Sequence, residues 1–143
     1  MQTDAPDYIH QALEALYCGR SYPKGFQRQL EFIDPLVRVH DTLPTLRMFE
    51  RLRGIFPHTE ITKLNLDSSA SAPTRHVFDF EVLYKRSPSD RGKRWASTLT
   101  VESTPEQDIT LLQEDWRAPF NADASSLSFL HPARRLLGTL CGL

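Results

Sequence analysis

Residues 75–86 show the most regular alternation of side chains in this chain of 143 residues. One face of the segment would carry a mostly aromatic and apolar row: His76, Phe78, Phe80, Val82 and Tyr84. The opposite face would be partly polar: Val77, Asp79, Glu81 and Leu83. A period of two is typical of a β-strand with one buried face. The fold must therefore supply a second layer that covers the aromatic face of a sheet.

Turn signals separate this strand from three further strands, predicted at 60–67, 94–102 and 108–116. The connections SPSDRGK and STPEQD are rich in the residues that favour turns. Short strands with turns between them are typical of antiparallel pairing of neighbours. The second half of the chain is therefore predicted to form an antiparallel meander of four strands.

Two helices and a short hairpin are predicted before the meander. Apolar residues recur at helical spacing over 5–18 and from 42 to about 56. Between them, residues 29–40 alternate as a strand, which should break at Pro35 because proline cannot donate in a central ladder. This order predicts an α+β domain: a cone-shaped, curved antiparallel sheet with packed N-terminal helices, a cystatin-like α+β roll. The interior of such a cone is where a pocket would form.

Length and charge narrow the functional classes. The chain fits one domain over 1–120, followed by a tail over 121–143 with a short helix from 132. A formal net charge of −1 disfavours nucleic acid as a partner, and no apolar run is long enough to span a membrane. The first twenty residues do not resemble a signal or transit peptide, which favours a soluble, cytoplasmic protein.

Among the eighteen acidic residues, Asp34 is the one whose position predicts a pocket. It is in phase with Leu30 and Phe32, so its carboxyl should point into the apolar interior. Burial would raise the pKa of that carboxyl and suit it to proton transfer. The alternative is structural, because an aspartate before proline commonly accepts backbone N–H bonds in a turn.

The remaining candidate residues follow from strand and helix phase. His76 could donate a proton inside the cone or lie at its rim, and Tyr84 could offer a hydroxyl or close the end of the core. Either His10 or Tyr17 could reach inward from the first helix, and helical phase does not decide which. The predicted pocket lining consists of Leu30, Phe32, His76, Phe78, Phe80, Tyr84 and Trp116.

No motif predicts a metal or a cofactor. Cys18 and Cys141 are far apart, the five histidines are scattered, and the glycines do not cluster into a phosphate-binding loop. Basic residues gather on the second helix and around the hairpin loop 85–94, where they could meet an acidic partner surface. A solvated helix face and a charged hairpin tip are the simpler explanation for them.

The element order and the phrase Phe-Ile-Asp-Pro resemble the nuclear transport factor 2-like superfamily, particularly its SnoaL-like and ketosteroid-isomerase-like branch. The resemblance covers residues 5–120 and rests on the N-terminal helix, on LEFIDPLVRV before the second helix, and on the final strand ending QEDW. It implies that Asp34 is the general base that moves a proton beside a carbonyl. The oxyanion donors of that branch are a tyrosine near the first helix and a protonated aspartate on a central strand. The corresponding strand here, 95–101, contains no acid.

Two functions are therefore expected. The first is a SnoaL-like domain that holds a small apolar ligand in its cone, with isomerase- or cyclase-type proton transfer by Asp34. The second is a non-catalytic protein-interaction or scaffold domain, as a homodimer or as a subunit of a larger assembly. The resemblance implies dimerisation through the exposed sheet face, where Val77 and Leu83 alternate with acidic residues.

Overall fold

The predicted elements are all present in the part of the chain that the computed structural model describes, residues 2–20 and 26–117. In chain order they are α1 (Asp7–Leu13), the π-helical turn η1 (Glu14–Cys18), β1 (Phe26–Ile33), β2 (Arg38–Val39), α2 (Thr42–Ile55), β3 (Glu60–Leu66), β4 (Arg75–Tyr84), β5 (Lys93–Ser103) and β6 (Ile109–Trp116). The predicted tail over 121–143 and its short helix lie outside the described residues.

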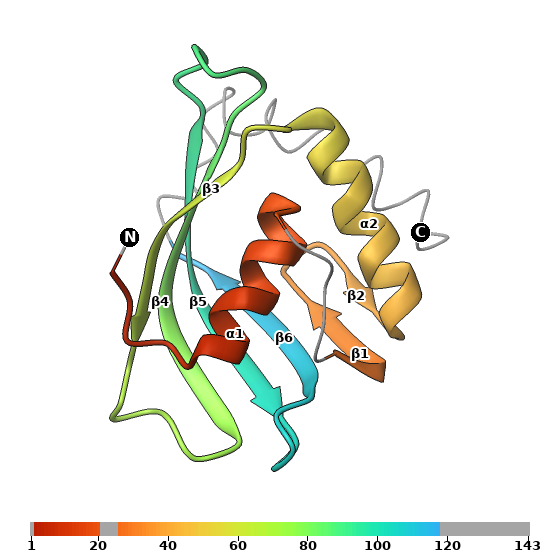
Figure 1. Cartoon of the computed structure of the whole chain (residues 1–143), viewed down its shortest axis with the longest axis vertical. Helices are drawn as coiled ribbons and strands as arrows, with labels where there is room; N and C mark the ends of the chain where they lie inside the picture. Colours follow the sequence, from red (N-terminus) through yellow and green to blue (C-terminus); the bar gives the residue numbers. More distant parts are fainter. Residues whose placement is uncertain (1, 21–25, 118–143) are drawn as a thin grey trace.

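The strands form one six-stranded sheet in the order β2-β1-β6-β5-β4-β3. Strands β3 to β6 pair as the predicted antiparallel meander. Strand β1 pairs with β6 in parallel, so the sheet is mixed. Helices α1 and α2 lie side by side over the concave face of this curved sheet (Figure 1). The predicted α+β fold with a helical layer on one sheet face is confirmed.

The aromatic row of β4 faces the helices and forms the centre of the core. Phe78, Phe80 and Val82 are buried. The ring of Phe49, from α2, packs edge-to-face on Phe32 with 5.1 Å between ring centroids. Apolar burial of this kind is the main favourable contribution to folding, roughly 25 cal/mol per Å² removed from water. The concave face is thus apolar along most of its length.

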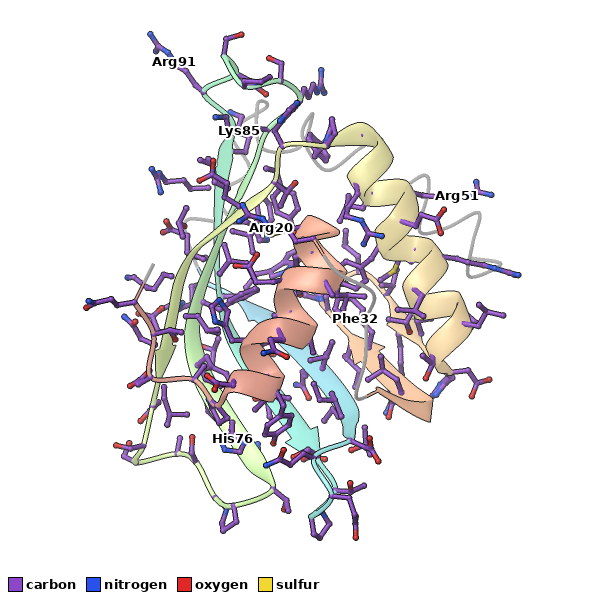
Figure 2. All side chains as sticks on the ribbon, viewed as in Figure 1. Arg20, Phe32, Arg51, His76, Lys85 and Arg91 are labelled. Atoms are coloured by element: carbon purple, nitrogen blue, oxygen red, sulfur yellow. The ribbon has the colours of Figure 1, made fainter. Side chains whose placement is uncertain are left out.

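The outer face of the sheet is polar. Asp79 forms ion pairs with Lys63, at 3.4 Å, and with Arg117. Beside it on the same strand, Glu81 pairs with Arg94 at 2.9 Å. On the helical layer, the Arg51 side chain points away from the body of the protein (Figure 2). No helix in the described ranges has both the length and the apolar character needed to cross a membrane.

Strand β1 ends where Pro35 was predicted to break it. The backbone N–H of Asp34 donates to the Val37 carbonyl at 3.0 Å, which closes a turn. Strand β2 then runs antiparallel to β1, with Phe32 paired with Val39. This turn fixes the position of the Asp34 side chain.

Gly92 stands in the hairpin loop between β4 and β5 with φ of +73°, and Gly19 ends η1 with φ of +66°. An alanine Cβ at Gly92 would lie 2.6 Å from the rigid carbonyl oxygen of Tyr84. At Gly19 it would lie 2.8 Å from the Arg53 guanidinium, which a flexible side chain can withdraw.

Gly92→Ala should therefore destabilise the protein more than Gly19→Ala does. Both variants incur the left-handed backbone cost of about 1–2 kcal/mol. Gly92→Ala should add about 1 kcal/mol for the displaced backbone. Urea denaturation of the two variants beside wild type measures the difference. Equal losses would show that the loop moves freely away from the added methyl group.

Candidate functional site

Asp34 accepts the backbone hydrogen bonds of the turn that follows it. Its Oδ1 accepts the backbone N–H groups of Leu36, at 2.8 Å, and of Val37, at 2.9 Å, as the turn interpretation predicts. Its Oδ2 has no hydrogen-bond partner among the described residues. The carboxyl is half-buried. Burial raises the pKa of Asp34, while the two backbone hydrogen bonds act in the opposite direction.

A second buried acid, Glu114, lies beside Asp34 because β1 and β6 run in parallel. Ile33 is paired with Gln113, so the next residue along each strand is Asp34 and Glu114 respectively. Glu114 is only 6% exposed. Its inward direction follows from its position two residues after the buried Leu112.

The environment of Glu114 favours the protonated form. Burial and the negative charge of Asp34 raise the pKa of Glu114 to about 7, while hydrogen bonds from Tyr17 and the Trp116 indole act to lower it. The Tyr17 hydroxyl donates to Glu114 Oε1 at 2.9 Å. A carboxyl with this pKa exists in both protonation states near neutral pH, as proton-transferring groups require.

Tyr17, not His10, is the residue of the first helix that reaches inward. The π-helical turn η1 carries Tyr17 into the core, where its ring packs edge-to-face on Phe49 and Phe80 at 4.7 and 5.2 Å. His10 instead lies beside Glu14, which is one turn further along the chain. The distance between His10 Nε2 and Glu14 Oε1 is 3.4 Å. Turns of π-helix occur frequently at functional sites.

Tyr84 completes the group from β4. Burial raises the pKa of Tyr84, and the charges of Glu114, Asp34 and Cys18 act in the same direction. We call Tyr17, Asp34, Tyr84 and Glu114 the acid–tyrosine cluster. Four elements, or the turns beside them, bring these side chains to one region of the concave face. Neither carboxyl has an ion-pair partner within the described ranges, so the buried Glu114 and the half-buried Asp34 lie together without a compensating cation.

The other predicted lining residues divide into three groups. Leu30, Phe32, Phe78 and Phe80 are fully buried core residues. Trp116 follows Glu114 on the same face of β6, and its ring packs edge-to-face on Trp95 at 5.1 Å. His76 lies at the far end of the concave face (Figure 2). Its ring stacks on Phe78, and burial lowers its pKa with no contribution from the charge of Asp34 or Glu114. His76 is therefore not part of the acid–tyrosine cluster.

No group of three His, Cys, Asp or Glu side chains in residues 2–20 and 26–117 could hold a metal ion. Cys18 lies at the end of η1, close to the cluster. Burial, with the charge of Glu14, raises the pKa of this thiol to about 12. The thiol is therefore protonated at neutral pH and is a poor nucleophile.

Sequence analysis missed Glu114, although the signal that marked Asp34 was present. Glu114 alternates with Leu112 and Trp116, so an acid stands between two inward-facing apolar residues. The expectation that Asp34 alone among the acids needs a pocket was wrong, because Glu114 is more deeply buried.

Comparison with known proteins identifies the fold. No protein-family model matches this sequence, and no curated protein does. Solved structures do match. A candidate SnoaL-like polyketide cyclase from Shewanella putrefaciens superposes with a TM-score of 0.64 at 10% identity, covering 88% of this chain and 86% of that one.

Two further structures give the same result. A candidate isomerase of the SnoaL-like family from Agrobacterium tumefaciens superposes with a TM-score of 0.60 at 17% identity, covering 77% of this chain and 95% of that one. An NTF2-like protein of unknown function from Cytophaga hutchinsonii also has a TM-score of 0.60, at 12% identity, covering 82% and 93%. The chain has the NTF2-like fold, as the resemblance implied.

Proposed function

We propose that this domain holds a small apolar ligand against the acid–tyrosine cluster and that Asp34 moves a proton on that ligand. One observation carries the proposal: the half-buried carboxyl of Asp34 interacts with the buried carboxyl of Glu114, with no cation beside them among the described residues. Burial of carboxyls without a cation lowers the stability of the folded protein, so we expect a functional reason for the pair. Perturbed acids on a concave face are candidates for proton transfer.

The two acids are suited to different roles. Asp34 accepts two backbone hydrogen bonds that favour its ionised form, so it is the better base. Glu114 keeps its proton to higher pH and can donate it to a ligand oxygen. Environments that give two neighbouring acids different pKa values are typical of acid–base pairs. Because the two groups interact, they titrate as a pair.

Tyr17 supports the donor role of Glu114. Its hydroxyl donates to Oε1 and fixes the carboxyl among apolar side chains. A donor fixed in an apolar surrounding stabilises negative charge as it develops on a carbonyl oxygen. The expected chemistry is removal of a proton beside a carbonyl, followed by isomerisation or ring closure. The names of two structural neighbours, an isomerase and a polyketide cyclase, are consistent with this class.

The test uses Asp34→Asn and a small β,γ-unsaturated ketone, 3-cyclohexen-1-one. Wild type should convert the ketone to its conjugated isomer, and the absorbance of the conjugated product measures the rate. Asp34→Asn should be at least about 100-fold slower because an amide cannot take the proton. The substitution keeps an oxygen that can accept the Leu36 and Val37 hydrogen bonds, so the turn should survive.

Asp115→Asn is the matched control, since Asp115 is an exposed acid next to Glu114 in the sequence. It should convert the ketone at the wild-type rate. If Asp34→Asn and wild type react equally, Asp34 serves the turn alone and the proton-transfer proposal fails. If wild type neither converts nor binds the ketone, the result favours the non-catalytic interaction domain.

A further inference from the structure

Ser97 is a polar residue buried in the apolar concave face of β5. It is 1% exposed, and its Oγ has no hydrogen-bond partner among the described residues. Ser97 alternates with Leu99 and Val101, both fully buried, so its side chain points to the same concave face. A buried hydroxyl left without a partner is costly, and native proteins contain few of them.

Ser97 is a close neighbour of Glu114. In the sheet, Ser97 pairs with Phe80 on β4 and with Trp116 on β6. The next inward pair along β5 and β6 is Leu99 with Glu114. Ser97 and Glu114 are therefore diagonal neighbours on one sheet face, about 7–8 Å apart between Cα atoms. One ligand atom between the two side chains could bond to both.

The surroundings indicate the chemistry of that ligand. The rings of Phe80 and Trp116 flank Ser97 and offer apolar contact to a ring compound. The negative charge of Asp34, which acts on Glu114, would also repel an anion. A serine hydroxyl both donates and accepts, as does a protonated carboxyl, so both groups suit a neutral oxygen.

We infer that Ser97 binds an oxygen atom of the ligand beside Glu114, and thereby selects a neutral ring compound with a hydroxyl or carbonyl over the corresponding hydrocarbon. The inference rests on the proposed ligand site and adds its specificity. Ser97 acts here as a recognition residue and takes no part in proton transfer.

Equilibrium dialysis of the full chain with 2-naphthol and with naphthalene, at about pH 6 where Glu114 is mostly protonated, tests this inference. Wild type should bind 2-naphthol about fivefold more tightly than naphthalene, the usual gain from one hydrogen bond. Ser97→Ala should lose most of the preference for 2-naphthol and keep only the part that Glu114 contributes, and its affinity for naphthalene should match that of wild type. Circular dichroism confirms that each variant is folded.

Thr98→Ala is the matched control, because it removes a hydroxyl from the next residue of β5, on the opposite sheet face. It should keep the wild-type preference for 2-naphthol. A preference that is undiminished in Ser97→Ala overturns the inference and leaves the ligand site itself standing, as does equal binding of both probes by wild type. If neither probe binds to wild type, the ligand site fails as well.

Discussion

Replacing Glu114 by glutamine should stabilise the protein above neutral pH by about 3 kcal/mol and remove most of the pH dependence of its stability. The pKa of Glu114 is raised from 4.5 to about 7 in the folded protein. The folded state therefore favours the protonated acid, and wild type should lose stability as the pH rises from about 4.5 to about 7. Each pKa unit corresponds to about 1.4 kcal/mol.

Glutamine suits this test because it cannot ionise and still offers an oxygen to the Tyr17 hydroxyl. Urea denaturation near pH 5 and near pH 8 should show a large decline for wild type and a small one for Glu114→Gln. Asp34 should account for part of the remaining slope, since burial also raises its pKa. Asp115→Asn, the exposed control, should follow wild type. If Glu114→Gln loses as much stability with rising pH as wild type does, Glu114 is ionised in the folded protein and is no proton donor.

Replacing Phe80 by alanine should cost about 3–5 kcal/mol of stability, the usual range for a buried phenylalanine. Phe80 is fully buried. Its neighbours in the sheet are Leu64 on β3 and Ser97 on β5, and the Tyr17 ring packs on it at 5.2 Å. The substitution therefore removes transfer energy and leaves a cavity beside the tyrosine that bonds to Glu114.

Thermal or urea unfolding measures this loss. Glu81→Ala is the matched control, because Glu81 is the next residue of β4, on the outer face, and its ion pair with Arg94 contributes at most about 1 kcal/mol. If Phe80→Ala does not fold, Phe80→Leu should fold with a smaller loss. A loss below about 1 kcal/mol for Phe80→Ala would mean that the core beneath the cluster is loosely packed.

The elements were predictable because their signals are local. Alternation in β4, the break at Pro35 and the helical spacing before it each depend on a few neighbouring residues. The parallel pairing of β1 with β6 was not predictable, because it joins residues about eighty positions apart. Phase along a single strand cannot show which other strand lies beside it.

The same limit applied to the candidate site. Alternation placed Asp34 inward, and it could have placed Glu114 and Ser97 inward by the same rule. It could not show that Asp34 and Glu114 are neighbours, so that the charge of Asp34 adds to burial in raising the pKa of Glu114. The choice between His10 and Tyr17 depended on the π-helical turn, which changes the helical phase that the sequence suggested.

The parallel pairing of β1 with β6 also sets when the acid pair can form during folding. Asp34 leaves the ribosome early, but Glu114 lies near the end of the last strand. Contacts between distant parts of a chain require closure of a long loop and tend to form late. Folding intermediates that lack this strand pair therefore keep both carboxyls in water with ordinary acidity. The raised pKa of Glu114 then appears only once β1 has paired with β6. Measuring the pKa of Glu114 during refolding would therefore show when these two strands pair.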